Sequence, residues 1–125
     1  MRAMALPARE SMLLRTPTPH ALYALADGAR GTRQTLRLMS RLAKDARTDP
    51  IIRAKAADLV ATVPGQAFRH EAEVLFEFVR DRIRYLGDVN GVETIQAPDV
   101  TLAVRQGDCD DKSTLLAALL ESIGR

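Results

Sequence analysis

The sequence predicts a mainly α-helical protein with about four helices, near residues 32–47, 50–62, 68–84 and 109–123. Within these ranges apolar residues recur at intervals of three and four, which places them on one face of a helix. Residues that favour helix starts and ends separate the ranges, among them Asp49-Pro50 and Pro64-Gly65. Together these two observations predict a fold built from packed helices.

The composition is that of a single soluble domain. A chain of 125 residues is long enough to bury one core, and 46% hydrophobic with 27% charged residues is ordinary for a globular protein. No stretch is apolar enough to cross a membrane, and Arg9, Glu10 and Arg15 interrupt any signal-peptide pattern near the start. A single cysteine cannot form an internal disulfide. We therefore expect a cytoplasmic protein with no membrane partner.

The charge is distributed unevenly along the chain. Residues 1–62 carry 11 Lys and Arg against 5 Asp and Glu, and residues 63–125 carry 7 against 11, so a net charge of +6 precedes one of −4. The basic half lacks interleaved aromatic residues and any nucleic-acid-binding motif. A solvated helix face is the better interpretation, and we expect no specific nucleic-acid partner.

Residues 1–31 are predicted to form an irregular N-terminal arm. Prolines and glycines interrupt each short apolar run there, and proline is not tolerated inside a helix. His20 lies in this arm and is expected to be an exposed loop residue. The helical domain is predicted to occupy residues 32–125.

The first two predicted helices each have a clear signal. The apolar positions of the 32–47 helix are Leu36, Met39, Leu42, Ala43 and Ala46. Its basic positions are Arg33, Arg37, Arg41 and Lys44. Two such stripes predict an amphipathic packing helix. The 50–62 helix is expected to begin with Asp49 as its N-cap and Pro50 at its first position.

The 68–84 helix is predicted to have a broad apolar face. Val74, Leu75, Phe78, Val79 and Ile83 follow helical spacing, with Phe76 beside them. We expect its aromatic residues to lie in the core. His70, near the start of this helix, is expected to be a surface or capping residue.

Residues 85–106 are predicted to be irregular chain with short extended pieces. Residues 100–104 have the composition of a strand, although Asp99 could instead cap a short helical turn there. Gln96 in this segment is a candidate oxyanion donor, because an amide side chain can donate to developing negative charge. A structural loop glutamine is the alternative.

The last predicted helix places the only cysteine at its start. Asp108 is expected to cap the helix, so Cys109 stands in its first turn, where the helix dipole lowers a thiol pKa. The negative charges of Asp108, Asp110 and Asp111 disfavour the thiolate and so raise the pKa of Cys109. Because these residues are adjacent in sequence, they point different ways around the helix, so we expect neither a metal site nor a cofactor here.

The stretch GDCDDKSTLLAALLESIG at residues 107–124 resembles the nucleophile motif of the transglutaminase-like superfamily, in particular its small bacterial and phage-borne members. The similarity extends back over residues 76–85 and 93–98. It implies that Cys109 attacks an amide carbonyl, as in papain-like enzymes. It also implies an α+β fold whose His and Asp or Asn lie on strands after this helix. Residues 32–125 would then be the helical part of that fold without its sheet.

These features predict a cysteine hydrolase or acyltransferase, of protease or amidase type, that acts on protein or peptide amides. Cys109 is its expected nucleophile, and the 125-residue chain alone is predicted to be inactive because the rest of the triad is missing. The alternative is a non-catalytic helical interaction module, encoded by a prophage. The apolar run at 115–123 would lack the cover of a sheet, which predicts a homodimer through this segment.

Overall fold

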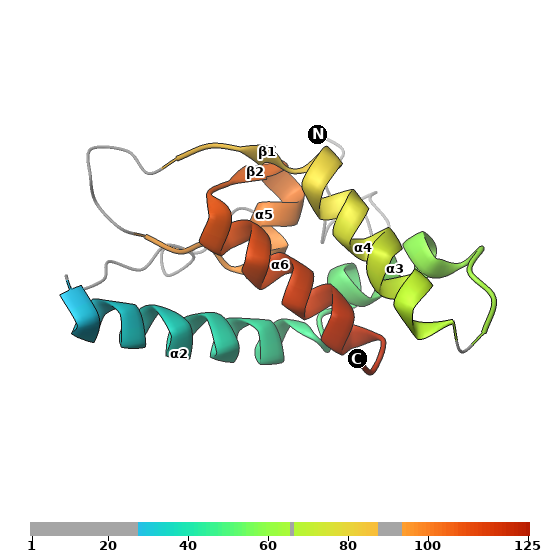
Figure 1. The fold of residues 1–125 in the computed structure, drawn as a ribbon, viewed down its shortest axis with the longest axis horizontal. Coiled ribbons are helices and arrows are strands. Elements are labelled where there is room, and N and C mark those ends of the chain that lie inside the picture. The colour runs from blue at the N-terminus through green and yellow to red at the C-terminus, as the bar shows by residue number, and fades with distance from the viewer. Residues whose placement is uncertain (1–27, 66, 88–93) are drawn as a thin grey trace, which may run out of the picture.

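The computed structural model describes residues 28–65, 67–87 and 94–125, and within them the fold is mainly helical, as predicted (Figure 1). Its elements are α2 (Gly28–Ala46), α3 (Pro50–Val60), α4 (Phe68–Arg82), β1 (Arg84–Tyr85), α5 (Pro98–Val104), β2 (Gln106–Gly107) and α6 (Cys109–Ser122). The predicted N-terminal arm, including His20, lies mostly outside the described residues. None of the described helices has the length and apolar character of a bilayer-crossing segment.

The last helix, α6, is the centre of the fold. It contacts α2, α3, α4 and α5, and in Figure 1 it lies between α2 and α4. Leu115, Ala118 and Leu119 are completely buried in the main core. The expectation of an uncovered apolar run is therefore wrong for Leu115 and Leu119, because the other helices of the same chain cover them. Half-buried residues at the edge of this core are Leu116, Leu120 and Ile123.

Helix α2 buries the expected face except at one position: Leu42, Ala43 and Ala46 are buried and Met39 is half-buried, but Leu36 is not part of this face. The helix begins at Gly28 instead of residue 32, and its buried residues include Leu38 but not Leu36, which is 60% exposed. Leu38 is four residues before Leu42, so both lie on the same face of the helix, whereas Leu36 is about 200° away from Leu38 around it. Leu38, Leu42 and Ile95 form a second, smaller core.

Helix α3 starts as predicted. The Asp49 side chain accepts a hydrogen bond from the backbone N–H of Ile51 at 2.9 Å, and Pro50 occupies the first turn. Both signals were readable from the sequence, because an N-cap and a proline at the first position act locally. The helix ends at Val60, two residues before the expected boundary.

Helix α4 corrects two expectations. It ends at Arg82 because Ile83 has extended backbone angles and leads into β1. Phe78 is buried, but Phe76 and Phe68 are about half exposed, so the aromatic residues are not all core. Phe76 lies outside the buried face. The Arg80 guanidinium packs over its ring, with Cζ 5.7 Å from the ring centroid.

The segment between α4 and α6 is more regular than predicted. Residues 98–104 form helix α5 and not a strand, with Ala97 as its N-cap instead of Asp99, and the left-handed Arg105 ends it. The two-residue strands β1 and β2 pair in parallel, with Tyr85 opposite Gly107. The backbone N–H of Leu86 donates to the Gly107 carbonyl at 2.9 Å. This pairing fixes the chain immediately before Cys109.

Candidate active site at the start of α6

A capping box forms the start of α6. The Asp108 carboxylate accepts from the backbone N–H of Asp111 at 2.9 Å, and the Asp111 carboxylate accepts from the backbone N–H of Asp108 at 3.1 Å. These reciprocal bonds satisfy a donor in the first turn that has no partner within the helix. The cap expected at Asp108 is confirmed, and Cys109 is the first residue of the helix.

The Asp111 carboxylate also holds a segment that is distant in sequence. It accepts from the backbone N–H of Gln96 at 2.7 Å, and the Gln96 side-chain amide lies 3.4 Å from its second oxygen. Asp111 is only 5% exposed. A buried carboxylate therefore joins the chain before α5 to the first turn of α6, which rigidifies the surroundings of Cys109.

Burial raises the pKa of Asp111 to about 6. The backbone hydrogen bonds from Gln96 and Asp108 lower it, and the charge of Asp108 raises it further. Burial has the largest effect because it disfavours the charged form of a carboxylate. Asp111 therefore changes protonation state close to neutral pH.

Gly107 lies directly against Asp111. A Cβ atom at position 107 would be 2.6 Å from Asp111 Cβ and 3.0 Å from its Oδ2. Real Cβ atoms do not approach other carbon atoms so closely, because the separation is well inside van der Waals contact. Only glycine fits at this point, between the end of β2 and the capping box.

Cys109 is exposed at the beginning of this buried helix. The backbone N–H groups of Cys109 and Asp110 lower the pKa of its thiol, as expected at a helix N-terminus. Desolvation, followed by the charges of Asp110 and Asp108, has the larger effect and raises that pKa above its ordinary value. The sequence leaves open whether the helix N-terminus or the nearby carboxylates dominate. In the structure the pKa-raising effects are larger, so the neutral thiol is favoured.

His70 lies at the opposite end of α6 from Cys109. Arg125, just beyond α6, bonds to Glu71 at 2.7 Å, so the first turn of α4 is beside the C-terminal end of α6. A helix of 14 residues is about 21 Å long. His70 is exposed there, as expected, and no histidine of the described residues adjoins Cys109.

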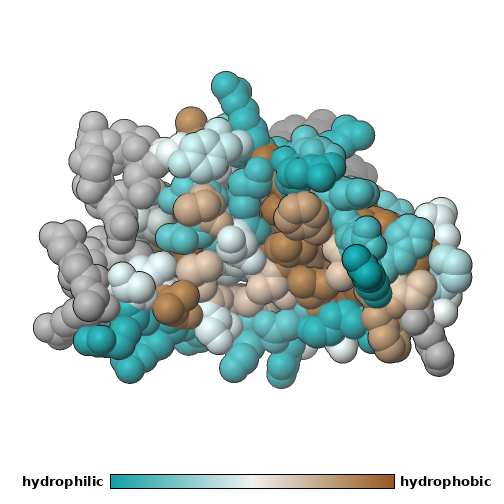
Figure 2. All heavy atoms as spheres, in the orientation of Figure 1, coloured by the Kyte–Doolittle hydropathy of each residue, from teal (hydrophilic) through white to brown (hydrophobic). Residues whose placement is uncertain are grey.

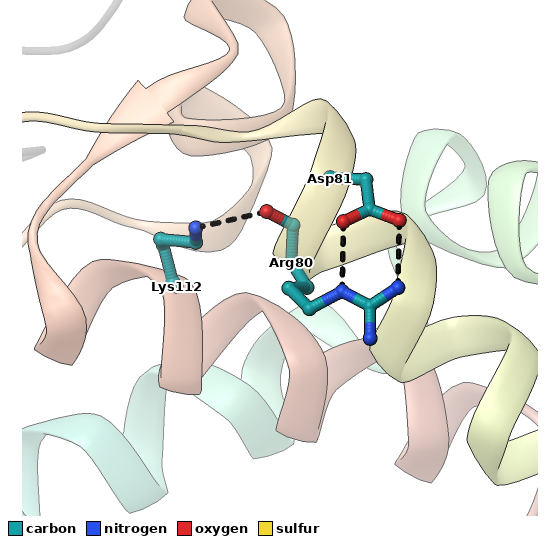
Figure 3. A network of polar contacts seen from close by, with 3 residues as sticks. All are labelled: Arg80, Asp81 and Lys112. Atoms are coloured by element: carbon teal, nitrogen blue, oxygen red, sulfur yellow. Dashed lines mark hydrogen bonds and ion pairs between the residues drawn. The ribbon is translucent and has the colours of Figure 1, made fainter.

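The other end of α4 lies beside the first turn of α6. Lys112 donates from Nζ to the backbone carbonyl of Arg80 at 3.4 Å, and Arg80 in turn makes two hydrogen bonds to Asp81 (Figure 3). A lysine at a helix C-terminus interacts favourably with the carbonyl groups left without a partner. Lys112 therefore anchors α4 to α6, while Arg80 holds the pKa of Asp81 below its ordinary value.

Gln96 is brought to the site, but its amide is partly engaged. Its Nε2 is 3.4 Å from Asp111 and 3.5 Å from the Gln106 carbonyl, which are long hydrogen bonds. Its buried Oε1 has no hydrogen-bond partner among the residues that the structure describes. The structure thus joins Gln96 to the first turn of the helix that carries Cys109, through Asp111.

Two contributors to this site were not predicted from the sequence. From the sequence, Asp111 was expected only to act on the thiol pKa of Cys109 through its charge, and no role was predicted for Gly107. The spacing of Asp108 and Asp111, as N-cap and third helical residue, was a readable signal for the capping box. Nothing local indicated the bond from Gln96.

The described residues contain no group of three or more His, Cys, Asp or Glu side chains placed to hold a metal ion. Comparisons of the chain with protein-family models, curated proteins and solved structures found no match. The site must therefore be interpreted from its own chemistry.

Proposed function

We propose that Cys109 is the nucleophile of a transglutaminase-like cysteine hydrolase or acyltransferase that acts on protein or peptide amides in the cytoplasm. The observation that carries this proposal is the position of Cys109, exposed as the first residue of a buried central helix. The backbone N–H groups around its sulfur are the kind of donors that stabilise a thiolate or a developing oxyanion. The proposed enzyme class rests on the resemblance of residues 107–124 to the nucleophile motif of the transglutaminase-like superfamily.

In the proposed reaction the Cys109 thiol first loses its proton to a base. The thiolate sulfur then bonds to the amide carbonyl carbon, the C–N bond breaks, and the departing amine takes a proton. Water or a second amine attacks the thioester and regenerates the thiol. Gln96 is the proposed oxyanion donor, and it would have to turn its amide away from Asp111 to do this.

The raised thiol pKa makes the base essential to this proposal. Because His70 is at the far end of α6, the base must come from outside the described residues. We therefore expect the described helical unit alone to show no amidase or transamidase turnover.

An assay with matched chains tests the proposal. The 125-residue chain and the product of its complete reading frame are incubated with fluorescent casein for hydrolysis and with dimethylcasein plus a fluorescent amine for transamidation. We expect activity only in a form that supplies a base, and its loss in Cys109→Ala. Activity that survives Cys109→Ala would contradict the proposal, as would inactivity of every form with both substrates.

A second candidate is a non-catalytic interaction module of phage origin, favoured by the raised pKa of the thiol. Apolar residues gather on the face shown in Figure 2. Leu116 and Leu120 of α6 are half-buried at the edge of the core. This candidate includes a homodimer through residues 115–123. Sedimentation equilibrium of the wild type beside Leu116→Glu tests it, with dimer expected only in the wild type. A monomeric wild type at high micromolar concentration would contradict it.

A further inference from the structure

Helix α2 presents a basic face to solvent. Arg33, Arg37, Arg41 and Lys44 follow each other at intervals of four, four and three residues, and all four are exposed. Such intervals keep the side chains on one side of a helix. We call these four residues the basic face. In Figure 2, hydrophilic residues line the lower edge of the molecule, where Figure 1 places α2.

In the part of the chain that the structure describes, the basic face lacks the carboxylate partners that three other arginines have. Arg69 pairs with Glu73, Arg80 pairs with Asp81, and Arg125 pairs with Glu71. Among the described residues, no ion pair joins any member of the basic face to a carboxylate. Asp45 is the single acidic residue of α2, and it forms no ion pair with Arg41, one helical turn earlier. The positive charge of this face is therefore available to a partner.

The surface between these side chains is hollowed. A shallow, open depression runs along the helix, lined by Leu36, Arg37, Ser40, Arg41, Lys44 and Asp45. Three of these residues are cationic and Ser40 adds a hydroxyl donor. These cations could donate to the oxygen atoms of an anion, although the exposed lining is mainly apolar and Asp45 adds a carboxylate that can only accept. Leu36, 60% exposed, is the only large apolar side chain in the lining.

We propose that the basic face of α2 binds the phosphodiester backbone of double-stranded nucleic acid without reading its sequence. The face extends about 16 Å along the helix axis, a length over which a duplex presents about ten phosphate charges. Three of its four cations are arginines, whose planar guanidinium groups bind phosphate oxygens in pairs. This activity is separate from the chemistry of Cys109.

The composition of the face argues against other anionic partners. A membrane-binding helix needs a wide apolar face beside its basic residues, and here Leu36 stands alone. A protein interface of ordinary strength has a buried apolar centre with aromatic anchors, and the lining of the depression contains no aromatic residue. The same lack of aromatic side chains favours a duplex over a single strand, whose bases are usually bound by stacking.

Fluorescence anisotropy with a labelled 20-base-pair duplex tests this proposal in the full 125-residue chain. If four phosphates are contacted, the logarithm of the association constant should fall with the logarithm of salt concentration with a slope of about −3 to −4. Arg37→Gln should weaken binding and reduce the magnitude of the slope by about 1. Cys109→Ala should bind as the wild type does.

Arg69→Gln is the matched control, because it removes the same charge from an exposed position on α4. We expect it to bind the duplex as the wild type does. Equal weakening by Arg69→Gln and Arg37→Gln would overturn the proposal, since only net charge would then matter. So would the absence of duplex binding at 50 mM salt. Tighter, Arg37-dependent binding to polyglutamate or to phosphatidylserine vesicles would also overturn it, and would identify a protein or a membrane as the partner.

Discussion

Replacing the buried Gly107 by alanine should disturb the capping box at the start of α6. The new Cβ would lie 2.6 Å from Asp111 Cβ, an atom whose position is set by the backbone of α6. A rotation of the Asp111 side chain cannot relieve this contact. Either β2 or the first turn of α6 must move, and the bond from Leu86 to the Gly107 carbonyl is placed at risk.

The expected cost follows from overpacking. Inserting a methyl group into a tightly packed site typically costs about 1–3 kcal/mol, and loss of a hydrogen bond adds about 1 kcal/mol. We therefore expect the free energy of unfolding to fall by about 2–4 kcal/mol. For a domain of this size, that corresponds to a decrease in Tm of roughly 6–15 °C.

Urea denaturation and thermal melts followed by circular dichroism measure this effect. Gly65→Ala is the matched control, because a Cβ there meets nothing within 4 Å, and it should change stability by less than about 0.5 kcal/mol. The reasoning would be refuted if Gly107→Ala were as stable as Gly65→Ala. A second readout is the alkylation rate of Cys109, which should change because the turn that carries it has moved.

Three further predictions concern the same helix. The pKa of Asp111 is raised to about 6 in the folded chain, so between pH 4 and 6 the folded chain binds more protons than the unfolded chain. The free energy of unfolding should therefore fall by up to about 3 kcal/mol as pH rises through this window. Urea titrations at several pH values should show this decrease in the wild type and not in Asp111→Asn. Removing the charge beside the thiol in Asp110→Asn should lower the pKa of Cys109 and speed its alkylation by iodoacetamide at pH 7.5, and an unchanged rate would show that this charge has no effect. Leu119→Ala should cost about 2–5 kcal/mol in chemical denaturation, since Leu119 is fully buried, whereas Leu36→Ala should be nearly neutral.

The helices could be predicted because their signals are local. The capping residues Asp49 and Asp108 start α3 and α6 where the sequence indicates. The burial of Leu38 in place of Leu36 on α2 could not be predicted in the same way. The choice between Leu36 and Leu38 depends on which segment packs against α2, and Ile95, which packs with Leu38, is far along the chain.

The arrangement of the candidate site was less predictable than its nucleophile. Cys109 could be singled out because it is the only cysteine and follows an N-cap. The bond from Gln96 to Asp111 joins residues 15 positions apart and depends on the turn of α5 between them. The direction of the Cys109 pKa shift could not be predicted either. Desolvation of the thiol, which outweighs the backbone donors, depends on the packing around it.

Acylation of Cys109 by 4-nitrophenyl acetate tests the central proposal most directly, because an activated ester needs no acid to assist its leaving group. Intact-mass spectrometry would give the acylation rate, and a pH titration of alkylation would give the thiolate fraction. The account predicts a thioester on Cys109 that forms faster, per thiolate, in the folded chain than in the chain unfolded in urea, because the first-turn N–H groups stabilise the oxyanion. A folded rate per thiolate equal to or below the unfolded rate would contradict it.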